Sequence, residues 1–232
     1  MRFAIIAVLL AACTDDVVEP DLPDGSEFEV VDDGKVDSRN QPCGSIGPFA
    51  QVIVNELGAL WRTQPSYLCA YREPIDTKPC SMIANNALYC RLDGAIGWHT
   101  PFMAKLYSTH GTFAPIVVMA HEWGHMNQHW LGLSNPARTT KQNELNADCQ
   151  AGIYVAWHQM IWGAYNIGPA IQGYSTLCAL GDPIHTWWDP TQHGTCAQRG
   201  TAFAHGYNQA FLQARNLAIN PQGTNLSICS PF

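Results

Sequence analysis

The sequence predicts one domain of the α+β class, mostly helical and with a small antiparallel sheet. Three observations support this class. The chain has 232 residues, of which 47% are hydrophobic and 13% charged, enough for one domain with a sizeable core. Several segments repeat apolar residues at helical spacing. One further segment has the pattern of two short strands joined by a tight turn.

The helical pattern is found in four segments, 46–61, 101–111, 112–132 and 141–165. The third has the clearest ends, because Thr112 can cap its start and Gly132 can end it. The last part of the stretch 181–216 is also expected to be helical.

The strand pattern lies in the run ALYCRLDGAIGW, residues 87–98. Its centre is Asp93-Gly94, a dipeptide that favours the turn of a hairpin. Just before it, Cys80 and Cys90 flank a turn-like segment, and we expect them to form a disulfide.

The first residues predict export and a lipid anchor. Arg2 is followed by ten apolar residues and Cys13, a run too short to span a bilayer. Its end, LAAC, resembles a bacterial lipobox, which implies a signal peptide over 1–12 and a lipid on Cys13. An ordinary export signal with an incidental cysteine is the alternative. Thr14 follows the cysteine in place of the Asp of inner-membrane retention, which favours the outer membrane of a bacterial envelope.

Residues 13–40 are expected to be an acidic, flexible tether, and 41–232 the folded domain. The stretch 15–37 holds ten acidic residues and one lysine, so this stretch accounts for the negative net charge of the whole chain, which is −7. This charge argues against nucleic acid as a partner. Without Cys13, eight cysteines remain, an even number that suggests up to four disulfides in an oxidising compartment.

The run HEWGH places His121 and His125 one helical turn apart, with Glu122 between them. Residues four apart lie on one face of a helix, so both imidazoles can reach one Zn²⁺ ion. Glu122 is offset around the helix and can reach a water molecule on the metal, as in zinc hydrolases. The missing side chain of Gly124 is expected to leave the pocket open. The alternative is a pair of hydrogen-bonded core histidines.

The third metal ligand is expected from the next helix. If 112–132 and 141–165 pack antiparallel, Glu144 returns to the two histidines. Asp148, four residues later on the same face, can then accept a hydrogen bond from a ligating imidazole. Two histidines and one glutamate leave a fourth position open, which is typical of a catalytic zinc site with one ion per chain. The alternative for both carboxylates is a solvated helix face.

Three runs, HEWGHMNQ (121–128), NELNADCQAG (143–152) and GDP…HGTCAQRG (181–200), resemble the bacterial family of putative neutral zinc metallopeptidases. The resemblance covers about 43–215 of the chain. It implies a zincin-like α+β fold with a small sheet over the active-site helix. It also implies that His121, His125 and Glu144 bind zinc and that Glu122 is the catalytic base.

Departures from the family pattern raise further expectations. Cys196 replaces the usual serine and Cys178 also departs from the pattern, which suggests that these two cysteines pair. His129 is expected to be a hydrogen-bonded or entrance residue.

His193 is the candidate donor to the oxyanion of the reaction, and Arg199 is expected to orient it or bind substrate. The alternative is a structural turn in which Arg199 pairs with a carboxylate such as Asp182 or Asp148.

The expected function is zinc-dependent hydrolysis of peptide bonds in a protein or peptide substrate, which the strand around 94–100 would bind by strand addition. Two alternatives stay open. The chain could be a membrane-anchored binding module that retains a zincin fold without catalysis, or it could hydrolyse a non-peptide amide.

Overall fold

The computed structural model describes residues 43, 46–75, 80–130, 132, 139–163, 165–182, 192–216 and 226–232. Within these residues the chain is α+β and mostly helical, as predicted. The helices are α1 (Pro48–Trp61), α2 (Thr100–His110), α3 (Phe113–Trp130), α4 (Thr140–Trp162), α5 (Gly168–Ala179) and α6 (Cys196–Asn216); the strands are β1 (Tyr67–Tyr71), β2 (Ala87–Cys90) and β3 (Ala95–His99); a 3-10 turn, η4, spans Leu226–Cys229.

The ends of the two site helices follow from local sequence. Helix α4 begins with a capping box, in which the side chains of Thr139 and Gln142 each accept a hydrogen bond from the other residue's backbone N–H. It ends where Gly163 takes a left-handed conformation with φ of 67°. Beyond α3, Gly132 has φ of +66°, so the predicted stop is confirmed. Helix α5 was not predicted, although Pro169 lies in its first turn, where proline favours a helix start.

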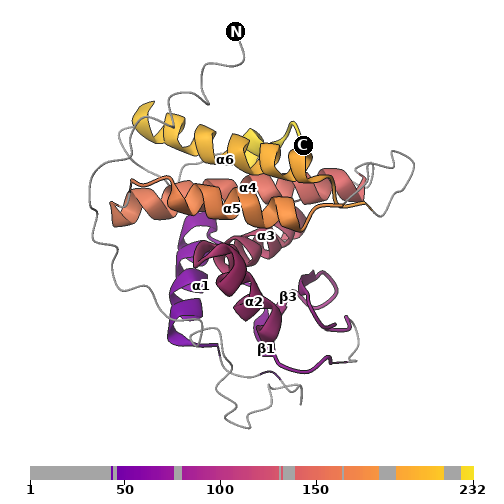
Figure 1. Ribbon diagram of the computed structural model, residues 1–232. Helices are drawn as coiled ribbons and strands as arrows, with labels where there is room; N and C mark the ends of the chain where they lie inside the picture. The colour runs from indigo at the N-terminus through magenta and orange to yellow at the C-terminus, as the bar shows by residue number, and fades with distance from the viewer. Residues whose placement is uncertain are drawn as a thin grey trace.

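The helices surround α3. Helices α4, α5 and α6 pack against one another on one side of α3, whereas α1, α2 and the strands lie on the other side (Figure 1). Most side chains of α3 are therefore buried, including those of His121 and Glu122, whereas His125 is partly buried. This placement explains why the first part of α3, residues 113–120, is entirely apolar although the rest of the helix carries histidines, a glutamate and two amides.

Glycines let the helices approach closely at the centre of this arrangement. A Cβ atom at Gly206 of α6 would collide with the carbonyl oxygen of Cys149 on α4. A Cβ at Gly124 of α3 would lie 2.9 Å from the Cα atom of Ala147 on α4. The prediction that Gly124 keeps the pocket open is therefore wrong, because this glycine serves the packing of α3 against α4.

The predicted hairpin is present, since β2 and β3 pair antiparallel. The sheet as a whole is mixed rather than antiparallel, because β1 pairs with β3 in parallel and the strand order is β1-β3-β2. All five residues of β3 are buried, and both of its edges are occupied. The predicted strand addition at 94–100 is therefore wrong, and β2 is the strand at the edge of the sheet that contacts α3.

Four disulfides link the described residues. Both predicted pairs, Cys80–Cys90 and Cys178–Cys196, are present. The other two are Cys43–Cys69 and Cys149–Cys229, the latter joining residues 80 apart in the sequence. Disulfides of this number indicate that the chain matures in an oxidising, extracytoplasmic compartment.

The predicted leader and tether, residues 1–40, lie outside the described residues, as does Cys13. Within the part of the chain that the structure describes, no helix has the length and apolar character that a bilayer crossing requires.

Candidate metal centre

Helix α3 brings the two imidazoles of the HEWGH run together. The Nε2 atoms of His121 and His125 are 3.0 Å apart, and the ring planes are nearly perpendicular. Both side chains line a cavity, while most other residues of the helix are buried. The spacing of four residues therefore places both imidazoles on one face of the helix, as predicted.

Helix α4 supplies the carboxylate of Glu144 at the same point. Its two oxygens lie 3.2 Å from the Nε2 atoms of His121 and His125, one oxygen to each ring. One nitrogen of each imidazole and one carboxylate oxygen all lie within 4.8 Å of one another. The earlier histidine of α3, His121, contacts the later carboxylate of α4, Asp148, and the later histidine, His125, contacts the earlier one, Glu144. The two helices therefore pack antiparallel, as predicted.

The far nitrogen of His121 is held by a buried ion pair. Its Nδ1 lies 2.7 Å from Oδ1 of Asp148, whose side chain is fully buried. Arg199 of α6 donates to both oxygens of this carboxylate, each over 2.8 Å. Because a carboxylate so bound only accepts hydrogen bonds, Nδ1 of His121 carries a proton, and in the neutral imidazole Nε2 then presents a lone pair.

The far nitrogen of His125 is held by an amide that the sequence reasoning missed. Its Nδ1 lies 3.1 Å from Oε1 of Gln128, whose Nε2 donates to the backbone carbonyl of Asn143 over 2.6 Å. The oxygen of this amide therefore faces His125, which again leaves a lone pair on Nε2. Gln128 could have been found from its position, since residues three apart share a helix face.

Electrostatics favour a positive charge between these residues. Burial alone would lower the pKa of His121, but Asp148 and then Glu144 outweigh it and raise the pKa to about 10. Burial would raise the pKa of Glu144, yet the neighbouring His125 and His121 lower it well below its usual range. Glu122 adds a further carboxylate at the cavity, so a cation there would be strongly stabilised.

These observations test whether the residues fit zinc. Three acceptor atoms, two imidazole lone pairs and one carboxylate oxygen, converge at short distances. Without a proton or a metal ion between them, such an arrangement is repulsive. Two histidines and one glutamate are also a usual donor set of catalytic zinc sites. The residues therefore fit one zinc ion, with an outer partner for each histidine.

The cavity beside these ligands has a volume of about 570 Å³. One wall is the edge strand β2 with the turn before it, and another is α3 with Glu122. No described residue donates a hydrogen bond to the Glu122 carboxylate, which lines the cavity. This volume lies within the range of about 300 to 1,000 Å³ that is usual for ligand pockets.

His193 and His129 also line this cavity. The side chain of His193 is about half exposed, and Asp182 accepts hydrogen bonds from the backbone N–H groups of His193 and Gly194. Nδ1 of His129 lies 2.7 Å from the hydroxyl of Tyr89 on β2, so His129 is a hydrogen-bonded residue, one of the two roles expected for it. It is not part of the described cluster of candidate metal ligands.

Arg199 pairs with a carboxylate, which is the alternative role that the sequence left open for it. It is buried, pairs with Asp148 and donates to the carbonyl of Leu180 over 3.1 Å. It therefore joins α6 to the support of His121 and does not hold His193. Asp182, the other carboxylate with which Arg199 could have paired in that alternative, instead accepts hydrogen bonds from the backbone N–H groups of His193 and Gly194 before α6.

Comparison with known proteins gives the family. Residues 55–214 match the family described as "Putative neutral zinc metallopeptidase". The match covers more than half of the chain, and the chain belongs to this family.

Relatives include "Uncharacterized protein YpfJ" from Escherichia coli (strain K12) and "Uncharacterized protein Rv2575" from Mycobacterium tuberculosis (strain ATCC 25618 / H37Rv). The first is 30% identical over 144 residues, 52% of this chain and 50% of the relative. The second is 28% identical over 151 residues, 51% of this chain and 50% of the relative. The chain thus spans about half the length of the curated relatives it matches. No solved structure matches the chain.

Proposed function

We propose that the protein is a zinc-dependent peptidase in which His121, His125 and Glu144 hold one zinc ion and Glu122 is the general base. The observation that carries this proposal is the convergence of three acceptor atoms beside a cavity that the carboxylate of Glu122 also lines. A bound zinc ion would lower the pKa of a water molecule toward about 7 and polarise the scissile carbonyl.

The other steps of the reaction are assigned to side chains around the cavity. Glu122 accepts a proton from the attacking water and delivers it to the leaving amine. His193, half exposed on the cavity, donates a hydrogen bond to the oxygen on which negative charge develops. Asp148 with Arg199, and Gln128, keep the two imidazoles in the tautomer whose Nε2 can bind the metal.

The substrate of this proposal is a protein or peptide in extended conformation. Strand β2 is the edge strand beside α3, and Ala87, Leu88 and Tyr89 line the cavity. A peptide backbone paired with this edge would pass the candidate metal centre. Among the described strands, β2 lies at an edge of the sheet, whereas β3 is enclosed between β1 and β2. We therefore propose β2, in place of β3, as the strand that pairs with the substrate.

The experiment that tests the base is Glu122→Gln. The variant should retain zinc, since Glu122 is not a ligand, and lose hydrolysis of a denatured protein by about 10² to 10⁴-fold. Zinc content by elemental analysis and cleavage of casein measure the two effects. Undiminished cleavage would remove Glu122 as base. Zinc binding by the wild type without any cleavage would favour a binding module, and cleavage of cell-wall amides alone would favour a non-peptide substrate.

We also propose that Cys13 carries a lipid that anchors the chain in the bacterial envelope, at the outer membrane. The four disulfides support an extracytoplasmic location, and the lipobox-like run before Cys13 supports the anchor. Cys13→Ser should move the protein from the membrane fraction to the soluble fraction. Equal membrane recovery of the variant would contradict the anchor.

A further inference from the structure

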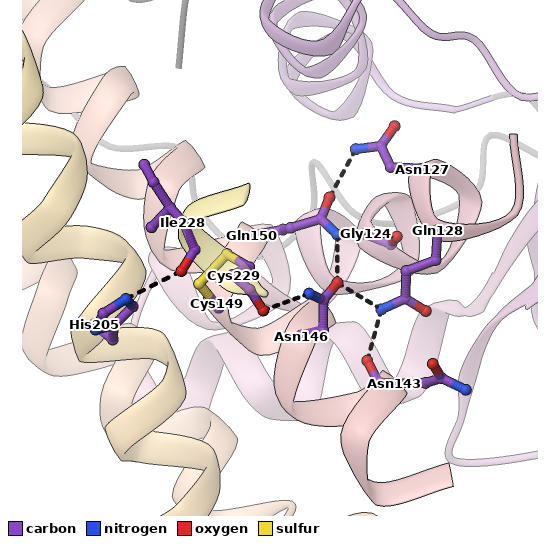
Figure 2. Close-up of a disulfide and its surroundings, with 10 residues drawn as sticks. All are labelled: Gly124, Asn127, Gln128, Asn143, Asn146, Cys149, Gln150, His205, Ile228 and Cys229. Atoms are coloured by element: carbon purple, nitrogen blue, oxygen red, sulfur yellow. Dashed lines mark hydrogen bonds between the residues drawn. A yellow bond between two sulfur atoms is a disulfide. The ribbon is translucent and has the colours of Figure 1, made fainter. Parts of the chain in front are cut away.

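A buried chain of hydrogen bonds runs from the C-terminal segment, residues 226–232, to the imidazole of His125. Its members are the backbone carbonyl of Cys229 and the side-chain amides of Asn146 and Gln128, and Figure 2 shows their arrangement. We call these three groups the amide relay. Both amides are buried, with 2% of each residue exposed. Buried amides with so little access to water depend on protein partners for their hydrogen bonds.

The C-terminal segment is fixed at the start of the relay. Cys229 forms a disulfide with Cys149 of α4, and both residues are fully buried. Beside the disulfide, Nε2 of His205 on α6 lies 3.1 Å from the carbonyl oxygen of Ile228 (Figure 2). These contacts hold the carbonyl of Cys229 over the first turns of α4, where it faces Asn146.

The direction of the relay follows from its first acceptor. Nδ2 of Asn146 donates to the carbonyl oxygen of Cys229 over 2.7 Å. A carbonyl cannot donate, so the nitrogen of this amide must face it and Oδ1 must face the other way. There Oδ1 accepts from Nε2 of Gln128 over 3.0 Å and from Nε2 of Gln150 over 2.9 Å.

The side-chain amide of Gln128 connects Asn146 to the candidate metal centre, and its orientation follows from that of Asn146. Nε2 of Gln128 has two acceptors on α4, Oδ1 of Asn146 and the carbonyl of Asn143. Its Oε1 is therefore turned toward Nδ1 of His125. Of the two neutral tautomers of His125, only the Nδ1–H form can donate to this oxygen, and its lone pair then lies on Nε2, which faces Glu144.

We infer that Asn146 is a positioning residue for His125, and that the C-terminal segment anchors it. Asn146 belongs to the NELNADCQAG run, and Gln128 to the HEWGHMNQ run, but neither residue lies at the candidate metal ion. The anchor lies beyond residues 55–214, the part of the chain that matches the family. This inference rests on the proposed zinc site and adds a support for one of its ligands.

The test compares Asn146→Ala with Asn127→Ala. Asn127 is an equally buried asparagine that donates to Gln150 and accepts from Thr63, and it has no contact with Gln128 among the described hydrogen bonds. Asn146→Ala should weaken zinc binding about tenfold in a chelator competition. Asn127→Ala should change it by less than about twofold, although thermal unfolding of the metal-free protein shows a comparable loss of stability.

A double-mutant cycle with Gln128→Ala separates positioning from general loosening. If Asn146 acts through Gln128, the double variant should bind zinc no more than about twofold more weakly than Gln128→Ala alone. Additive losses in zinc affinity would overturn the inference. So would an equal loss in Asn127→Ala, because zinc affinity would then follow stability.

The wild-type protein provides a test that does not depend on folding of the variants. In long-range ¹H–¹⁵N spectra of the zinc-loaded protein, His125 should show a protonated Nδ1 and a zinc-bound Nε2. A zinc-bound Nδ1 would overturn the inference while leaving the zinc site in place. Failure of the wild type to bind zinc in the competition assay would instead overturn the proposed function.

Discussion

Helix α4 carries a buried cluster of histidine and glutamate near each end, and the two clusters differ in kind. Near the start of the helix, Glu144 meets His121 and His125 of α3. Near its end, Glu56 of α1 meets His158 over 2.7 Å. Both glutamates are largely buried, and each lies within hydrogen-bond distance of an imidazole.

The cluster at Glu56 is complete without a cation. Its carboxylate accepts from the hydroxyl of Tyr154, from Nδ1 of His158 and from Nε1 of Trp162, each over 2.7 Å. Three donors surround one acceptor, which satisfies the buried charge. This cluster ties α1 to α4 and has the chemistry of a structural contact.

The cluster at Glu144 has the opposite balance. The N–H groups on Nδ1 of His121 and His125 are committed to Asp148 and Gln128, so neutral imidazoles would present lone pairs to the oxygens of Glu144. Composition and burial therefore do not mark a metal site. The direction of the outer hydrogen bonds decides whether a histidine–glutamate cluster is satisfied by the protein or needs a proton or a metal ion at its centre.

The largest expected effect separates the two clusters directly. Glu144→Ala should weaken zinc binding by more than about 100-fold, because a ligand is lost and not merely an outer partner. Glu56→Gln should keep the wild-type zinc stoichiometry. Chelator competition with both purified variants measures the difference. Equal losses would contradict the distinction between the clusters.

A smaller effect is expected from the outer partner of His121. Asp148→Asn keeps the shape of the side chain but removes the charge that Arg199 and His121 share. Zinc affinity should fall about 10 to 100-fold. A matched measurement of metal-free stability is required, since Arg199 loses its buried partner. Unchanged affinity with lower stability would mean that Asp148 serves only Arg199.

The smallest effect concerns stability at the other cluster. Glu56→Gln turns an amide N–H toward one of three donors and should cost about 1 to 3 kcal/mol of unfolding free energy, measured by chemical denaturation at neutral pH. Zinc affinity is the control and should not change. A stability within error of the wild type would show that the carboxylate charge contributes nothing to this contact.

The same variant has a predicted pH dependence. Burial opposes ionisation of Glu56, but His158, Tyr154 and Trp162 outweigh it and lower its pKa below 4.5. A folded-state pKa below the unfolded value gives stability that is present above the unfolded pKa and is lost as the pH falls through the folded one. The difference between wild type and Glu56→Gln should therefore shrink in acid. A difference that grows in acid would contradict the assigned direction.

Much of the site was predictable because its information is local. The spacing of His121 and His125 fixes a shared helix face, and the same holds for Glu144 and Asp148 on α4. The hairpin was likewise predictable from Asp93-Gly94 between two apolar runs. The insertion of β3 between β1 and β2 was not, since strand order depends on contacts between segments far apart in the sequence.

Two site helices, the residues on each of their faces and the candidate metal ligands could be predicted from the sequence alone, because helical periodicity and ligand spacing are properties of neighbouring residues. Only the tertiary structure decided the partners: Arg199 at Asp148, the C-terminal carbonyl at Asn146, and three donors at Glu56. Hydrogen-bond direction depends on which groups meet across packed helices, and that meeting is set by the whole fold.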